Sequence, residues 1–131
     1  MQKGMVDVCI TGTDRTAING DVCNKIGTYL KALSAYDNNI PFYVAAPISS
    51  IDFSISNGIK NIPIEERDEK EVSSMCGLNS KGTMERISIT PKNANCKNYS
   101  FDVTPAKYIT KIITEKKIVD ANESSISDLE V

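Results

Sequence analysis

The pattern of apolar and polar residues over the first third of the chain predicts a β-strand, a polar loop and a helix. Over residues 6–11, apolar side chains alternate with small or polar ones, as in a strand of a covered sheet: Val6, Val8 and Ile10. Asp21 is a good N-cap. After it, apolar residues recur at helical spacing, which predicts a helix over residues 21–36: Val22, Ile26, Tyr29, Leu30, Leu33 and Tyr36.

A second apolar strand is predicted over residues 42–46. Two strands joined by one helix require a right-handed parallel crossover, so the predicted fold class is α/β. The rest of the pattern predicts shorter elements: a loop or short strand over 51–64, a polar helix over 68–72, loops over 73–83 and 92–100, a strand over 87–91, a helix over 105–115 and a small strand at 118–119.

The two ends of the chain differ in character. The first four residues resemble the end of a helix, with Lys3 in its last turn and Gly4 in the C-cap position. We therefore expect part of the domain to precede this chain, which would then not be a stable monomer alone. Residues 1–119 are expected to form one domain. Residues 120–131 are polar and acidic, which predicts a disordered tail.

The composition narrows the class of function. The 131 residues carry 15 Lys and Arg against 17 Asp and Glu, for a net charge of −2, and both signs are scattered. A nucleic-acid surface needs clustered cations, so we expect no nucleic-acid partner. No apolar stretch approaches membrane length and no signal peptide is visible, so we expect no membrane partner either.

Cysteine and histidine usage bears on the chemistry. The four cysteines show no CxxC spacing, and Cys9 and Cys23 lie in apolar segments. This pattern favours buried free thiols over disulfides and a cytoplasmic location. The chain has no histidine, which excludes His-type zinc sites, Ser-His triads and histidine acid–base chemistry within these residues.

Candidate chemical groups gather after the first predicted strand, at the edge where open α/β sheets bind ligands. Asp14 is the candidate general acid or base. Arg15 and Lys25 are candidate phosphate contacts. Asn24 and Lys25 are expected in the first turns of the helix, where backbone N–H groups favour an anion. Each has a plainer alternative, because a loop Asp more often caps backbone amides and an exposed Lys is usually only solvated.

Other polar residues lie at equivalent places. Ser49, Ser50 and Asp52 follow the second predicted strand and are expected on the same rim as Asp14. Asp102 precedes the last predicted helix, and we favour a capping function for it. Neither GxGxxG nor GxxxxGK[ST] is present, so the sequence gives only weak support to a dinucleotide or P-loop site.

Four blocks of the chain resemble the methylthioribose-1-phosphate isomerases, the aldose–ketose isomerases of methionine salvage. They follow the order of that family over nearly the whole chain: TGTDRTAINGDVCNKIGTY, IPFYVAAPISSIDFSI, IPIEERDEKEV and FDVTPAKYITKIITEK. The resemblance implies a Rossmann-like parallel sheet with flanking helices, incomplete in this chain. It also implies a sugar phosphate substrate, no cofactor, no metal, and a homodimer of the complete unit.

The resemblance also assigns residues. It implies that Asp14, from the G-x-D-R block, is the catalytic acid/base and that Asn24 and Lys25 contact the substrate, with Arg15 beside them. The second catalytic residue of that family is a Cys in an upstream T-x-C-N-x-G block, which this chain lacks. The resemblance therefore implies the C-terminal part of an isomerase, inactive by itself and completed by an upstream half as a separate chain.

Two related families keep other functions open: the regulatory subunits of the translation initiation factor exchange complex and the ribose-1,5-bisphosphate isomerases. Both resemble residues 6–29, but they usually carry a small residue in place of Arg15 and lack the PIEERD block. Arg15 and residues 62–72 therefore favour the methylthioribose enzyme. Two features depart from its pattern: Thr13 replaces the usual Ala, and N-Y-S-F-D at residues 98–102 replaces N-P-A-F-D.

Overall fold

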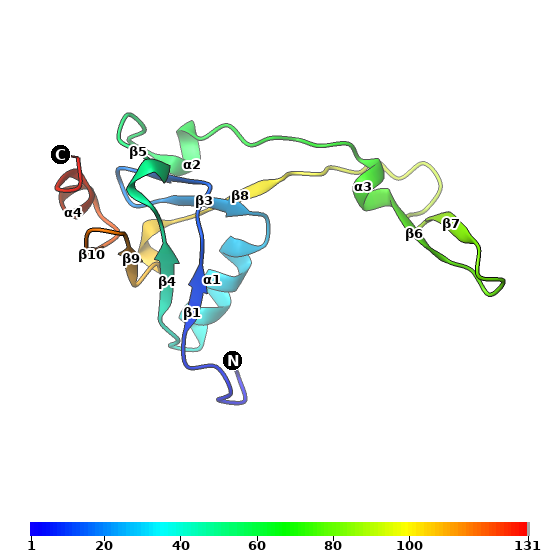
Figure 1. Ribbon diagram of the computed structural model, residues 1–131, viewed down its shortest axis with the longest axis horizontal. Helices are drawn as coiled ribbons and strands as arrows, with labels where there is room; N and C mark the ends of the chain where they lie inside the picture. Colours follow the sequence, from blue (N-terminus) through cyan, green and yellow to red (C-terminus); the bar gives the residue numbers. More distant parts are fainter. Residues whose placement is uncertain (131) are drawn as a thin grey trace. The chain divides into compact units, whose positions relative to one another are not determined.

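A computed structural model describes residues 1–130 of the chain (Figure 1). The chain divides into two units: the first comprises Met1–Pro63 and Phe101–Val131, and the second is Ile64–Ser100. The first unit holds the predicted βαβ unit and every candidate site residue. In the described part of the chain, no helix has the length and apolar character needed to cross a membrane.

The first sheet of the first unit has the strand order β1-β4-β9-β10. The strands β1 (Cys9–Thr11), β4 (Phe42–Ala45) and β9 (Lys111–Ile113) run parallel, and β10 (Ile118–Val119) is antiparallel to β9. The parallel pairing of β1 with β4 confirms the predicted α/β class. Within the described residues β1 is an edge strand; its Ile10 is 61% exposed, and Val8, just before the strand, is 44% exposed.

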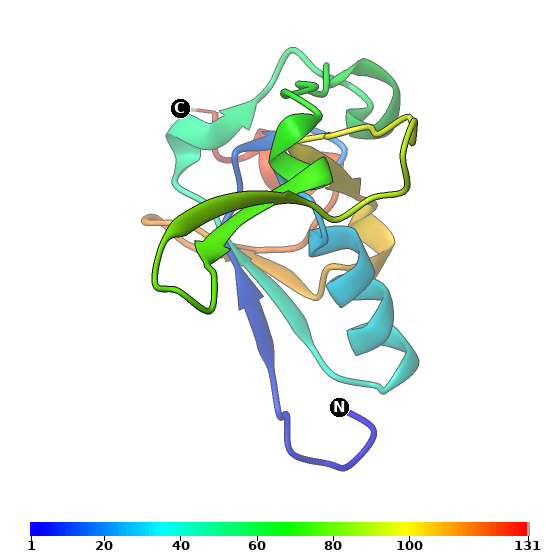
Figure 2. The same cartoon turned by 90° about the vertical axis from the view of Figure 1, so that its right-hand side faces the viewer.

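The helix α1 covers Thr28–Asp37 and contacts β1, β4 and β8, and Figure 2 shows it beside β4. The predicted helix over residues 21–36 is therefore wrong in its first turns, because Val22–Lys25 form the strand β3. Gly27 separates the two with φ 96°, a left-handed backbone that glycine adopts without strain. The helix buries its small side chains, Thr28, Ala32 and Ala35. Three residues of the predicted apolar stripe are exposed, namely Ile26, Leu30 and Tyr36, whereas Tyr29 and Leu33 are half-buried and Val22 is buried in β3.

The second sheet has the order β5-β2-β3-β8. The strands β2 (Arg15–Ala17) and β3 form an antiparallel hairpin, flanked by β5 (Ile51–Asp52) and β8 (Phe101–Thr104). The turn of the hairpin contains Gly20 at φ 90°. A Cβ at Gly20 would lie 2.5 Å from the carbonyl carbon of Ala121, so only glycine fits against the C-terminal segment.

Asp21 is buried at this turn and does not cap a helix at residues 22–36, which corrects the prediction. Its Oδ2 accepts hydrogen bonds from the Asn19 side chain at 2.8 Å and from the Gly58 N–H at 3.1 Å. Its Oδ1 accepts one from the Ala106 N–H at 3.0 Å. The carboxylate therefore joins the hairpin to the helix α2 (Gly58–Asn61) and to the 3₁₀ turn η2 (Ala106–Tyr108).

The predicted helix over residues 105–115 is wrong. After η2 the chain becomes extended and forms β9. The segment from Ile109 to Thr114 is rich in β-branched residues, which favour a strand and whose apolar members also fit helical spacing. The small strand predicted at residues 118–119 is confirmed as β10.

The predicted disorder of the tail over residues 120–131 is wrong for the part that the structure describes; Val131 lies outside it. Residues Glu123–Ser127 form the helix α4, whose first turn is capped by the Asn122 side chain. Ile126 and Leu129 are buried and join the hydrophobic core. That core links both sheets and α1: Val22, Ala32, Ala35, Phe42, Val44, Ala46, Ile51, Ile109, Ile112, Val119, Ile126 and Leu129.

The second unit is built on a hairpin. After the short helix α3 (Lys70–Ser73), the strands β6 (Ser74–Leu78) and β7 (Met84–Ser88) pair antiparallel. The polar helix predicted over residues 68–72 is thus present as α3, with shifted bounds. The strand predicted over residues 87–91 begins and ends three residues earlier, as β7. The predicted loop over 73–83 is wrong, because cross-strand pairs of apolar residues form in it, such as Met75 with Ile87.

Candidate functional site

Asp14 lies in the loop between β1 and β2, and its backbone N–H donates a hydrogen bond to the Cys23 carbonyl at 2.9 Å. Its side chain is exposed and borders a cavity of about 310 Å³. The lining combines the loop after β1 with the segment after β4: Asp14, Arg15, Ser49, Ser50, Ile51, Asp52 and Phe53. The prediction that Ser49, Ser50 and Asp52 share the rim of Asp14 is therefore confirmed.

Arg15 and Asp52 form an ion pair across this cavity, on the neighbouring strands β2 and β5. The guanidinium Nη1 lies 3.6 Å from Oδ2 of Asp52. The Ser54 hydroxyl donates to Oδ1 of Asp52 at 2.6 Å, and the Ser54 N–H donates to the same oxygen at 3.1 Å. These hydrogen bonds, with a smaller contribution from Arg15, hold the pKa of Asp52 below its ordinary value. Asp52 is therefore a carboxylate at neutral pH, and it orients Arg15 beside Asp14.

Asn24 and Lys25 end the strand β3 and lie outside the helix α1, which corrects their predicted place in its first turns. The Asn24 side chain donates to the Thr28 hydroxyl at 3.0 Å. Lys25 is exposed, and its Nζ lies 4.8 Å from the centroid of the Phe101 ring. Neither residue lines the cavity of Asp14. The antiparallel register of β2 and β3 nevertheless keeps all four candidate residues at one end of the second sheet.

Asp102 caps a helix, as favoured from the sequence, but the helix is α1 and not a following one. Its Oδ2 accepts the Gly27 N–H at 2.7 Å, and its Oδ1 accepts the Tyr29 N–H at 3.1 Å. These donors were candidates for binding a substrate anion, and a carboxylate of the chain itself already occupies them. Because Asp102 is far from both residues in sequence, local sequence signals could not find this contact.

Cys23 lies in β3, opposite Arg15 of β2. Burial raises the pKa of its thiol to about 11, and the negative charges of Asp14 and Asp102 add to this effect. The thiol is therefore neutral at physiological pH and a poor nucleophile. All four cysteines are free, as the sequence predicts, and Cys23 is buried.

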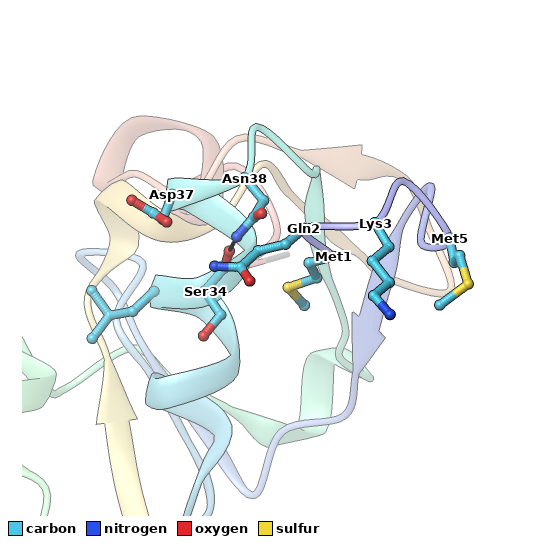
Figure 3. A pocket seen from close by; sticks show the side chains of 8 residues that line it. Met1, Gln2, Lys3, Met5, Ser34, Asp37 and Asn38 are labelled. Carbon is cyan, nitrogen blue, oxygen red and sulfur yellow. Dashed lines mark hydrogen bonds between the residues drawn. The ribbon is translucent and has the colours of Figure 1, made fainter.

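A larger cavity, of about 610 Å³, lies near the amino ends of the parallel strands of the first sheet (Figure 3). It is formed by the first residues and the second half of α1: Met1, Gln2, Lys3, Met5, Leu33, Ser34, Asp37 and Asn38. It faces away from the carboxyl ends of the parallel strands, so we give it no part in the site. Among the described residues, no three His, Cys, Asp or Glu side chains lie together so as to hold a metal ion.

Comparison with known sequences places this geometry in a family. The model of the initiation factor 2 subunit family matches residues 1–120. The methylthioribose-1-phosphate isomerase of Escherichia coli O45:K1 is 55% identical over 129 residues, which are 98% of this chain and 34% of that protein. That of Methylocella silvestris is 55% identical over 127 residues, 97% of this chain and 35% of that protein. The chain thus spans about a third of the length of these relatives.

Two solved structures share the fold. The 5-methylthioribose 1-phosphate isomerase of Pyrococcus horikoshii has a TM-score of 0.83 and 43% identity, over 98% of this chain and 33% of that one. The translation initiation factor eIF-2B subunit delta of A. fulgidus has a TM-score of 0.82 and 38% identity, over 98% of this chain and 34% of that one. The predicted α/β fold with flanking helices is thereby confirmed.

Proposed function

Because the chain belongs to the initiation factor 2 subunit family, we propose that it is the C-terminal part of a methylthioribose-1-phosphate isomerase. The reaction converts 5-methylthioribose 1-phosphate, an aldose derivative, to the ketose 5-methylthioribulose 1-phosphate. The observation that carries the proposal is the 55% identity to curated isomerases over nearly the whole chain. The eIF-2B subunit is similar in fold but less identical, at 38%, so a non-catalytic regulatory function is the weaker alternative.

Asp14 is the proposed catalytic acid. The anomeric phosphate locks the sugar ring, and protonation of the ring oxygen by a carboxylic acid would open it. The Asp14 carboxyl group borders the cavity and, within the described residues, has no hydrogen-bond partner that would compete for this function. A positioned acid of this kind contributes roughly 10²–10⁴ to the rate. The later transfer of hydrogen between C2 and C1 is internal to the sugar, so the reaction needs no external oxidant or reductant.

Arg15 and Lys25 are the proposed phosphate contacts, with Asn24 beside them. Both cations are at the same end of the second sheet as Asp14, and both are exposed. Charge-assisted hydrogen bonds from such groups suit a phosphate dianion. The ion pair with Asp52 keeps the Arg15 guanidinium at the cavity.

We further propose that an upstream part of the same protein completes the domain and that two complete units form a dimer. The exposed Ile10 of the edge strand β1 and the exposed Val8 just before it support this, because an unpaired apolar edge invites another strand. Strong hydrogen-exchange protection of β1 in an isolated monomer of residues 1–131 would argue against an upstream partner. The four free thiols fit a reducing compartment, and we propose the cytoplasm.

The test is to mix the complete protein with methylthioribose 1-phosphate and follow ketose formation. The isomerase proposal predicts steady accumulation of the ketose without added cofactor. The regulatory alternative predicts an unchanged sugar and co-purification with subunits of a translation-factor exchange complex. The two outcomes exclude each other, so one preparation decides between the classes.

A further inference from the structure

We propose that Asp102 is a positioning residue that holds the backbone turn after β3, so that Lys25 can contact the phosphate of the substrate. This inference rests on the proposed function, because it assumes that Lys25 binds a phosphate. It adds a residue of β8 that touches no substrate in the proposed site and acts through the segment Asn24–Tyr29.

The first support is the geometry of the turn. Gly27 is the N-cap of α1 with φ 96°, and it has no side chain with which to cap the helix. Asp102 supplies the cap from the neighbouring strand, accepting the N–H groups of Gly27 and Tyr29 with its two oxygens at 2.7 and 3.1 Å. A carboxylate at a helix N-terminus is favoured by the helix dipole. Two of the N–H groups at the start of α1 are therefore held by one carboxylate.

The second support is that Lys25 belongs to the same network. The Thr28 hydroxyl donates to the Lys25 carbonyl at 2.7 Å and accepts from the Asn24 side chain at 3.0 Å. Thr28 is only 4% exposed, so these bonds are shielded from water. The backbone of Lys25 is thus tied to the first turn of α1, whose position depends on the carboxylate of Asp102.

The third support is the register of β3 on β8. Asn24 lies opposite Asp102, and Lys25 lies opposite Phe101, whose ring is 4.8 Å from the Lys25 ammonium. The strand that carries Asp102 therefore also guides the Lys25 side chain. Because Asp102 already occupies the N–H groups of Gly27 and Tyr29, we assign the phosphate contact here to the lysine.

The experiment is a double-mutant cycle in the complete protein, with inorganic phosphate as the probe in titration calorimetry. Asp102→Asn keeps the shape but places an NH₂ group against one of the two N–H donors. We expect it to weaken phosphate binding about tenfold, a loss typical of a displaced contact. In a Lys25→Ala background the same substitution should change binding less than twofold, because its effect passes through Lys25. Asp7→Asn, at an exposed carboxylate, is the control for charge.

Turnover of methylthioribose 1-phosphate is measured alongside. For Asp102→Asn we expect KM to rise about tenfold while kcat stays within threefold, since Asp14 is held by a different loop. A purely structural cap would lower the melting temperature and leave KM and the phosphate affinity of the folded protein unchanged, which would overturn the inference.

The failures of the two proposals differ. A wild-type protein that leaves the sugar unchanged refutes the isomerase function, while the phosphate cycle still decides on Asp102. The positioning function is overturned if Asp102→Asn changes the phosphate affinity equally in the wild-type and Lys25→Ala backgrounds. It is also overturned if the wild-type protein binds no phosphate, even when the enzyme is active.

Discussion

Replacement of Asp21 by asparagine tests how the fold holds the site in place. The Asp21 carboxylate is 4% exposed and accepts four donors: Asn19 Nδ2, Gly58 N, Ile59 N and Ala106 N. It is the polar junction between the hairpin that carries the site, the helix α2 and the turn η2. Asparagine has nearly the same volume but only one acceptor oxygen.

The magnitude follows from the geometry. With its oxygen in place of Oδ2, asparagine keeps three donors, but its NH₂ group then faces the Ala106 N–H at 3.0 Å. One charge-assisted hydrogen bond is lost, which costs about 1.5–3 kcal/mol. The remaining hydrogen bonds become weaker, because their acceptor is no longer a charged carboxylate. We expect Asp21→Asn to lower the free energy of unfolding by about 2–4 kcal/mol.

The assay is urea unfolding of the complete protein followed by circular dichroism, with Asp7→Asn as the matched control. Asp7 is exposed, so removal of its charge should cost no more than about 0.5 kcal/mol. If both substitutions lower stability by the same small amount, the Asp21 junction does not contribute as the geometry indicates, and the reasoning is refuted.

Three further outcomes are expected. Lys25→Ala should raise the substrate KM without lowering the melting temperature, because Lys25 is exposed. A lower melting temperature with an unchanged KM would show that Lys25 stabilises the fold and does not bind substrate. Gly20→Ala should destabilise the protein by roughly 1–3 kcal/mol through its left-handed backbone and its clash with the C-terminal segment, whereas Gly12→Ala, with open space around it, should not. With a thiol pKa of about 11, Cys23 should resist alkylation at pH 8 until the protein unfolds, while exposed Cys76 reacts at once, which mass spectrometry of labelled peptides would show.

The elements that could be predicted from the sequence depend on local signals. Alternating apolar residues indicate β1, a short apolar run after Pro41 indicates β4, and their connection by a helix requires the parallel pairing that the structure shows. The shared rim of Asp14 and Asp52 follows from that topology alone, because both residues come after the carboxyl ends of neighbouring parallel strands.

The sequence-based predictions are wrong where contacts with residues far along the chain determine the local structure. The apolar residues from Val22 onward fit helical spacing, but Val22–Lys25 pair with Phe101–Thr104, a strand far along the chain. The partner of Asp102 is equally remote, since it caps a helix more than seventy residues earlier. The acidic tail is polar in composition, which predicted disorder. Two of its apolar side chains, Ile126 and Leu129, are nevertheless buried in the core and suffice to anchor the segment there.

The most direct test of the account is the rate of ketose formation from methylthioribose 1-phosphate, compared between the complete wild-type protein and its Asp14→Asn variant. Phosphorus NMR distinguishes the anomeric phosphate of the substrate from the primary phosphate of the product. We expect conversion by the wild-type protein and a rate at least about a hundredfold lower for the variant, at an unchanged melting temperature. A variant rate within threefold of the wild-type rate, or no conversion by either protein, would contradict it.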